Sequence, residues 1–394
     1  MSLWRALRWS TAGIFLLLIA IATYAAAISE RDFFGDYPLV ALSQGWVALV
    51  VTGPLLAGWA AWDTARIMPW LDATFAGAHR AKALSGLTAP ALLLGVLLPL
   101  AIVTYVAGWP PGPTTALVTI SAGATLIAAA SLGSAVGSIL PRLVAVPTAA
   151  AAVYAVLALG VADPTSAVGR VTLPGLVAPC CNNTEQIGST ALIFASVLGT
   201  LVTLGSLITL GGPRERRWRV VSLASTILIV LAAGRLVSQN VSVDDTIVAR
   251  ESATHCRKAE GLEVCVWPEH SAEREMATTT IAQGVKVASS LGVKLPNRWS
   301  EDPAQGGATF MWTNVLADEE HRYALGIDIA HYVGCTDIGE DAPVGILFAE
   351  KMGGAPAYMR QRGSAADEQL KEITSLTPAE QSKWLANHVK TCRT

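Results

Sequence analysis

Cysteine and histidine are the residue types in this chain of 394 residues that could do chemistry. The six cysteines are an even number, and in an oxidising compartment such a set is typical of disulfides. The pairs that we favour are Cys256–Cys265 and Cys335–Cys392. The vicinal Cys180 and Cys181 could be free, paired or bridged, because the sequence does not determine connectivity.

Histidine could supply a metal site, since five of the six histidines follow residue 250. Zinc binds His together with Cys, Asp or Glu. The candidate ligands are His270, His321 and His331, with Glu269, Glu320 and Asp328 close by in sequence. No HExxH or similar spacing joins them, and adjacent Glu-His pairs cannot easily face one metal on a strand. We therefore expect no metal, and histidines scattered over the surface.

Motifs for catalysis or nucleotide binding are missing from the sequence. There is no GxSxG motif and no Walker A or other phosphate-binding loop. We expect no catalytic residue and no cofactor in this chain, so any ATP and Mg would bind to a separate chain.

Charge divides the sequence into two unlike parts. Residues 1–239 hold 13 Lys and Arg and 8 Asp and Glu, within long apolar blocks. Residues 240–394 hold 15 Lys and Arg against 22 Asp and Glu, a net charge of −7. Neither part is basic enough to indicate nucleic-acid binding. The sequence predicts a membrane domain over 1–239 and a separate globular domain over 240–394.

The apolar blocks predict seven membrane spans, each near the ~20 residues that a bilayer requires. They cover about 9–28, 39–62, 87–107, 115–139, 143–161, 188–210 and 220–238. The first could be taken for a signal peptide, but we prefer an uncleaved helix. Only Leu140-Pro141-Arg142 separates the fourth and fifth spans. A tight turn there fits best, and one kinked helix is the alternative.

Orientation follows from the basic residues between the spans. With the N-terminus inside, the inner segments hold 10 Lys and Arg and the short outer loops hold 2, as the positive-inside rule requires. The strongest anchors precede the seventh span and are Arg214, Arg216, Arg217 and Arg219. This multi-pass topology in the cell membrane places residues 240–394 and all six cysteines outside the cytoplasm.

No predicted span carries a carboxylate, Lys or His in its middle; Arg235 lies near an outer end and can snorkel. This argues against ion-coupled transport, in which buried ionisable groups do the work. The fourth span carries Gly133 and Gly137, a GxxxG pattern that permits close backbone approach. It is either a dimer face or a chance product of a span rich in Ala and Gly.

The longest inner segment, 63–86, predicts a short amphipathic helix at the cytoplasmic interface. Its apolar residues Ile67, Trp70, Leu71 and Phe75 recur at roughly helical spacing. The segment is either a solvated connector with Trp70 as an interface anchor, or a coupling helix that docks on a cytoplasmic ATPase. The outer segment 162–187, with three prolines, favours a re-entrant or interfacial hairpin.

The part after residue 240 has the pattern of a small α/β (α+β) domain. Glu263–Trp267 alternates like a strand, and Ser271–Leu291 has the pattern of a helix with acidic residues in its first turn. Thr377-Pro378-Ala379-Glu380 forms a capping box and predicts a helix that continues to Val389. The fold class is therefore an all-α polytopic membrane bundle followed by a small extracytoplasmic α/β domain.

Residues 1–210 resemble the permease subunits of type-2 ABC transporters. The shared features are the cytoplasmic N-terminus before span one, the amphipathic inner loop between spans two and three, and the Pro-containing outer segment before span six. The C-terminal part resembles an outer domain of actinobacterial permeases of this kind, through His255-Cys256, the stretch VCVWPEH at 264–270 and the closing LTPAEQSKWLANHVKTC. The seventh span departs from the six-span pattern and would place the C-terminus outside.

This resemblance implies a permease dimer of identical or paralogous subunits in the lipid bilayer, driven by two ATPase subunits. The substrate would be a peptide, a lipid or a drug-like molecule, and transport would be export. The residues expected to contact the ATPase are Arg66, Ile67, Trp70, Leu71, Phe75 and Arg80. The alternatives are a membrane-anchored hydrolase that uses Glu269, His270, His321 or His331, and a sensor or structural protein whose bundle only anchors the outer domain.

Overall fold

The structure is a computed structural model. It describes residues 12–34, 37–74, 77–108, 112–166, 168–177, 184–213, 215–240, 242, 245–250, 253–259, 261–310, 312, 318–335, 343–354 and 371–392. For residues 12, 29–34, 77–91, 238, 240, 343, 391 and 392 it describes the backbone alone. The chain forms two compact units, 1–249 and 250–394. The predicted boundary, between 239 and 240, lies a short way before this division.

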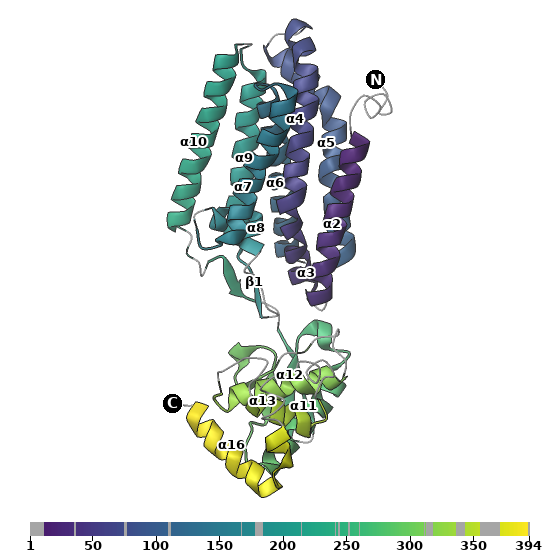
Figure 1. Cartoon of the computed structure of the whole chain (residues 1–394), viewed down its shortest axis with the longest axis vertical. Helices are drawn as coiled ribbons and strands as arrows, with labels where there is room; N and C mark the ends of the chain where they lie inside the picture. Colours follow the sequence, from purple (N-terminus) through teal and green to yellow (C-terminus); the bar gives the residue numbers. More distant parts are fainter. Residues whose placement is uncertain are drawn as a thin grey trace. The chain divides into compact units, whose positions relative to one another are not determined.

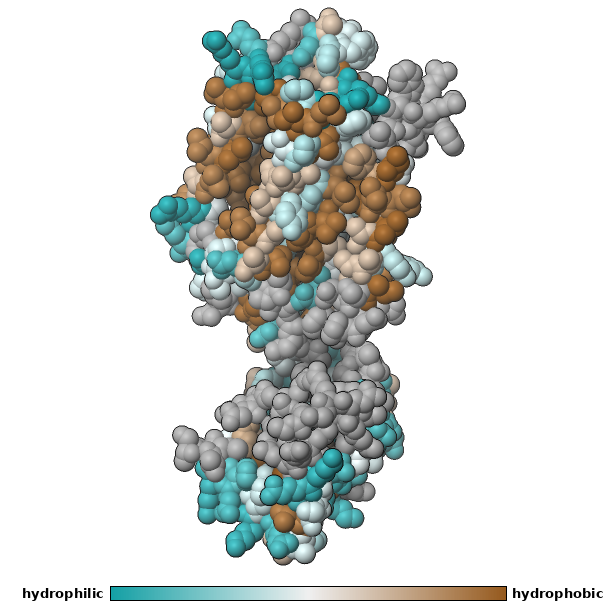
Figure 2. Space-filling model, viewed as in Figure 1, coloured by the Kyte–Doolittle hydropathy of each residue, from teal (hydrophilic) through white to brown (hydrophobic). Residues whose placement is uncertain are grey.

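The first unit is a bundle of helices that run side by side (Figure 1). Its helices are α2 (Ala12–Phe34), α3 (Pro38–Gly45), η1 (Trp46–Ala48), α4 (Leu49–Thr74), α5 (Gly77–Ala107), α6 (Pro113–Gly137), α7 (Arg142–Ala162), η2 (Gly169–Val171), α8 (Leu173–Val177), α9 (Ser189–Gly211) and α10 (Arg216–Asn240). Figure 2 shows hydrophobic side chains over the sides of the bundle and hydrophilic ones gathered at one end.

Five helices of the described chain are long and apolar enough to cross a membrane. They are Pro38–Thr74, Pro113–Gly137, Arg142–Ala162, Ser189–Gly211 and Arg216–Val237. Shorter apolar stretches, Gly13–Ile28 and Leu92–Ala107, lie in α2 and α5. These helices give the first unit the character of a membrane protein, while the count of seven spans stays a prediction.

The turn between the fourth and fifth predicted spans is confirmed. Helix α6 ends at Gly137, and α7 begins at Arg142. Pro141 has extended backbone angles, φ −62° and ψ 148°, and precedes the first turn of α7. A proline at a helix start costs no hydrogen bond, because the first amides of a helix have no intrahelical acceptor. The two spans are therefore separate helices.

The prediction for residues 63–86 was wrong in its form. No separate helix occupies this segment, since α4 continues to Thr74 and α5 begins at Gly77. Helix α4 also accommodates Pro54 and Pro69 in its interior. Its last turns are held by packing, because Met68 and Leu71 are buried against Leu210 of α9. The apolar spacing correctly indicated a helix, but that helix is an extension of the span.

The GxxxG pattern of α6 forms a close contact inside the chain. A Cβ at Gly133 would stand 2.8 Å from Cα of Ala57 in α4, and a Cβ at Gly137 would stand 2.9 Å from Cα of Ala61. Carbon atoms in contact prefer ~3.5–4.0 Å, so only glycine fits at either position. The small residues of α4 and α6 therefore bring these two backbones together, and α4 already covers the stripe that could have been a dimer face.

The segment between α7 and α9 folds onto one end of the bundle. All five residues of α8 are buried, and the Gln44 side-chain amide of α3 donates to the Val177 carbonyl at 2.8 Å. Strand β1 (Glu185–Ile187) then pairs antiparallel with β2 (Ile247–Ala249), which follows α10. Among the described residues of this segment, those of α8 are thus covered by protein.

The second unit is a small α+β domain. Its sheet has the order β3-β4-β5-β6; β3 pairs antiparallel with β4, and β4, β5 and β6 are parallel. The elements are β3 (His255–Ala259), β4 (Leu262–Val266), η3 (Pro268–His270), α11 (Arg274–Ser290), β5 (Arg298–Ser300), η4 (Pro303–Gln305), β6 (Ala308–Thr309), α12 (Asp318–Tyr332), α13 (Pro343–Lys351) and α16 (Pro378–Cys392). Trp299, Leu347 and Phe348 lie fully buried in its core.

Local sequence signals placed two helices of this domain correctly. The predicted helix 271–291 is α11, which begins after the turn of η3. The capping box also forms, because the Glu380 carboxylate accepts from the Thr377 amide at 2.8 Å and the Thr377 hydroxyl accepts from the Glu380 amide at 3.4 Å. Two exposed amides at the start of α16 are thereby satisfied within the chain.

Candidate functional site

One end of the helical bundle carries Arg66, Arg142, Arg216, Arg217 and Arg219, and we call it the basic end. Arg216 and Arg217 are exposed there, whereas Arg219 is buried, with 3% of its surface accessible. The fourth predicted anchor, Arg214, lies outside the described residues. The four arginines are close together in sequence, but Arg219 differs from Arg216 and Arg217 in being buried.

The Arg219 side chain joins three helices at the basic end. One guanidinium nitrogen donates to the Ser138 carbonyl just after α6 at 2.8 Å, and the other contacts Asp72 of α4 at 2.6 Å. The Ser138 carbonyl belongs to the C-terminal end of a helix, where the helix dipole favours a cation. Arg219 therefore ties the beginning of α10 to the end of α6 and to the last turns of α4.

The last turns of α4 present one fixed face and one open face. Leu71 is fully buried, Met68 is 3% exposed and Asp72 bonds to Arg219, whereas Trp70 is 56% exposed. On the preceding turns, the Asp63 carboxylate lies 3.4 Å from Arg66 and accepts from the Trp59 indole at 3.0 Å. The exposed Trp70 side chain thus lies at the end of α4, and the other side of this helix end is fixed by contacts with the bundle.

The expected coupling residues are only partly brought together. Trp70 and part of Arg66 are accessible, whereas Ile67 and Leu71 pack toward the bundle. Phe75 lies outside the described residues, and Arg80 is placed by its backbone alone, within α5. Among the predicted coupling residues whose side chains the structure describes, Trp70 is therefore the most accessible.

A disulfide joins Cys256 and Cys265, the first favoured pair. These residues lie directly opposite each other on β3 and β4, with the Cys265 side buried in the domain. Cys335 is also disulfide-bonded, and its partner is not among the residues whose side chains the structure describes. Cys392 is placed by its backbone, and the vicinal pair Cys180 and Cys181 lies outside the described residues.

The three candidate metal ligands lie in different surroundings. His270 is fully buried beside Glu301, His321 is 3% exposed and stacks on Trp312 at 3.9 Å, and His331 is exposed on α12. The expectation of scattered surface histidines was therefore wrong for His270 and His321. In the part of the chain that the structure describes, no three His, Cys, Asp or Glu residues converge on a metal position.

The buried histidine belongs to a polar network in the domain. The His270 ring nitrogen Nδ1 lies 2.8 Å from Glu301 Oε1, and Glu301 Oε2 accepts from the Trp267 amide at 2.7 Å. Burial is the main effect on Glu301 and raises the pKa of its carboxyl, although the bonds from His270 and Trp267 oppose that rise. Glu301 was not predicted from the sequence, because it lies in a short polar connection after β5 and belongs to no recognisable motif.

Glu269, a ligand candidate beside His270, has a different role. Its two carboxylate oxygens accept from the Arg250 guanidinium at 2.7 and 2.8 Å. The same guanidinium lies over the Trp267 ring, 4.2 Å from its centre. Such paired bonds and cation–π contacts hold a strand and its flanking turn in place. Glu269 and His270 are neighbours in sequence, and they bond to different partners, Arg250 and Glu301.

Comparison with known proteins adds no relative. No family model matches the sequence, no curated protein matches it and no solved structure matches the fold.

Proposed function

We propose that this chain is the permease subunit of a type-2 ABC transporter, with its basic end in the cytoplasm and residues 250–394 outside. Two copies, or one copy and a paralogue, would line a path for an exported peptide, lipid or drug-like substrate. A separate ATPase would bind ATP and Mg and would drive the two copies between conformations.

The observation that carries the proposal is an exposed tryptophan on a firmly packed helix end at the basic end of the bundle. Trp70 is 56% exposed on the last turns of α4, while Leu71 and Asp72 fix the opposite side of the same turn. Exposed tryptophans on rigid supports are frequent anchors of protein interfaces. A helix end that is both continuous with a membrane helix and firmly held can pass a displacement from a cytoplasmic partner into the bundle.

Two features of the sequence agree with the proposal. The predicted spans carry no carboxylate, Lys or His in their middle, so the chemistry of ion coupling is missing. The chain also has no nucleotide-binding motif, so the energy for transport must come from another subunit.

Co-purification tests the proposal directly. The full chain, tagged at its C-terminus, is extracted in mild detergent, and the proteins that accompany it are identified. We expect a stoichiometric ATP-binding protein, and we expect Trp70→Ala to weaken that complex by roughly thirtyfold, as the loss of an interface tryptophan costs at least about 2 kcal/mol.

Trp218→Ala is the matched control, because Trp218 is 45% exposed at the same end of the bundle on α10. Arg66→Glu is a poorer choice, since it would place a second carboxylate next to Asp63. Loss of the partner in Trp70→Ala but not in Trp218→Ala supports the proposal. A preparation without any nucleotide-binding protein, under conditions that keep comparable complexes intact, favours a sensor or structural role of the outer domain instead.

A further inference from the structure

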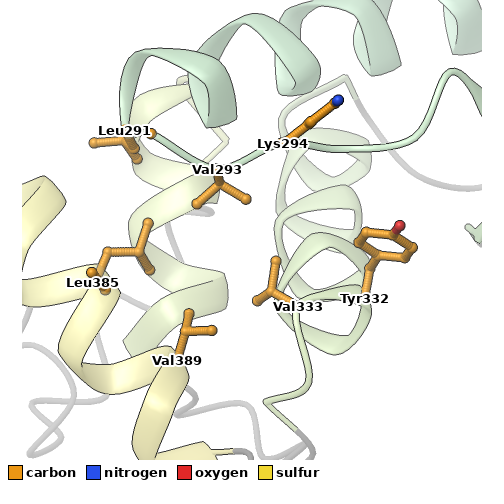
Figure 3. A pocket seen from close by; sticks show the side chains of 9 residues that line it. Leu291, Val293, Lys294, Tyr332, Val333, Leu385 and Val389 are labelled. Atoms are coloured by element: carbon orange, nitrogen blue, oxygen red, sulfur yellow. The ribbon is translucent and has the colours of Figure 1, made fainter.

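The second unit contains a pocket of about 380 Å³ whose walls come from three segments. These are the connection after α11, the end of α12 and one side of α16 (Figure 3). Its volume lies within the range of small-molecule sites, ~300–1,000 Å³.

Aliphatic side chains form most of the wall. They are Leu291, Val293, Val333, Leu385, Ala386 and Val389. Figure 3 shows Leu291 and Leu385 on one side of the space and Val293 and Val333 on the other. Leu385 is fully buried, and Leu291 and Val333 are each 5% exposed. The floor is thus fixed by the domain core and offers a ligand an apolar surface to bury.

Backbone polar groups of the wall are already in use. Gly292 has φ +79°, and the amides of Gly292 and Val293 donate to Ser289 and Ala288 at the end of α11. This is the arrangement in which a glycine closes a helix. These two amides are therefore not free to bind a ligand in the pocket.

Two side chains of the lining can supply those bonds. Lys294 is exposed and Tyr332 is 43% exposed, and the Lys294 amine and the Tyr332 hydroxyl lie on the same side of the view in Figure 3. Among the described residues, neither group has a hydrogen-bond or ion-pair partner. One is a cation and the other a neutral donor, so together they favour an anionic group with two acceptor oxygens.

We propose that this pocket binds a single-chain amphiphile, with its aliphatic chain against Leu385 and Val333 and its carboxylate at Lys294 and Tyr332. A carboxylate matches the site because it carries one negative charge against the single charge of Lys294, and because its two oxygens can accept from Lys294 and Tyr332. A phosphate dianion would carry a second negative charge, which no cation of the lining balances. The proposal is independent of the transport proposal, since every residue that it uses belongs to residues 250–394.

Photolabelling of the full-length protein in phosphatidylcholine nanodiscs tests the site. The probe is decanoate that carries a diazirine and an alkyne, and the labelled peptides are mapped by mass spectrometry. We expect labels within 291–294 and 384–389. Unlabelled decanoate should compete, decyl phosphate should compete less, and decanol and decylammonium should compete at least about tenfold less, because hydrogen bonds to charged groups contribute ~1.5–3 kcal/mol.

Two pairs of variants complete the test. Lys294→Glu should weaken labelling about tenfold, whereas Lys286→Glu, the same charge change at an exposed site outside the pocket, should leave it unchanged. Ala386→Trp should fill the pocket and abolish labelling, whereas Ala379→Trp, on the exposed surface of the same helix, should not.

The proposal fails if the probe labels other segments, or if Lys294→Glu binds as well as Lys286→Glu. Equal competition by decanol or decylammonium would also overturn it, because the charged head would then play no part. Stronger competition by decyl phosphate than by decanoate would overturn the carboxylate as the preferred head. Because Lys294 is exposed, its replacement tests the site even if Ala386→Trp does not fold.

Discussion

Replacement of Arg219 by leucine should destabilise the bundle far more than replacement of Arg217 by leucine. Both changes remove one positive charge from the same flank of α10, so their effects on orientation in the membrane are matched. They differ in packing, since the Arg219 side chain is 4% exposed and bonded to Ser138 and Asp72, whereas Arg217 is exposed.

The magnitude follows from the bonds that are lost. Hydrogen bonds of a charged group contribute ~1.5–3 kcal/mol each when they are buried. Both bonds of Arg219 are partly buried, and the Asp72 side chain is 29% exposed, so solvent weakens the pair with Asp72. We expect Arg219→Leu to cost about 2–4 kcal/mol, and Arg217→Leu to stay within about 0.5 kcal/mol of the wild type.

Thermal unfolding of the full-length protein in nanodiscs measures the difference. For a unit of this size, 1 kcal/mol corresponds to roughly 2–4 °C, so the midpoint of Arg219→Leu should fall by roughly 5–15 °C. Asp72→Asn alone should cost less than Arg219→Leu, because the bond to Ser138 remains. Equal midpoints for the two leucine variants would refute the reasoning, since the four arginines would then act through charge alone.

Three further predictions follow from packing, titration and the disulfide. Gly133→Ala should destabilise the bundle by roughly 1–3 kcal/mol, because it forces α4 and α6 apart. Gly123→Ala is the control: the nearest atom to a new Cβ there is 4.0 Å away, so this change should be neutral or stabilising by up to ~1 kcal/mol. Equal unfolding midpoints for the two variants would exclude the close contact between α4 and α6. Burial raises the pKa of the Glu301 carboxyl above its ordinary value of 4.5, so this carboxyl stabilises the fold fully below about pH 4.5 and loses that effect as pH rises through its folded-state pKa. Glu301→Gln should therefore flatten this part of the pH profile of unfolding. An unchanged profile would show that Glu301 is not the source of the pH dependence. Replacement of Cys256 and Cys265 together by alanine should lower the stability of the second unit by about 2–3 kcal/mol, measured as the midpoint of tryptophan fluorescence in denaturant, and an unchanged midpoint would contradict it.

Hydropathy predicted the five long apolar helices of the bundle well, because an apolar run of about 20 residues is a strong signal in the sequence. It could not predict that α4 runs on to Thr74, because a periodic apolar stretch next to a span fits both a helix at the interface and an extension of the span. The contact of Leu71 with Leu210 decides between them, and that contact joins residues that are remote in sequence.

The buried polar groups were the least predictable part of the sites. Glu269 and His270 are neighbours in sequence, yet their partners are Arg250 and Glu301, which are 19 and 31 positions away. No spacing rule connects such pairs. The parallel pairing of β4 with β5 brings the residues that follow these strands, His270 and Glu301, close together. The Cys256–Cys265 pair was favoured from the sequence, and its physical reason came from the structure, in which a short antiparallel hairpin places the two residues opposite each other.

The contact between α4 and α6 also bears on how this protein can evolve. The atoms that exclude a side chain at Gly133 are backbone atoms of Ala57, and those at Gly137 are backbone atoms of Ala61. A smaller residue at 57 or 61 would not make room, because the obstructing atoms are present in every amino acid. No compensating substitution in α4 can therefore rescue a change in α6, so an alignment of relatives should show both glycines as nearly invariant. It should also show no covariation between positions 57 and 133, although these residues are in direct contact.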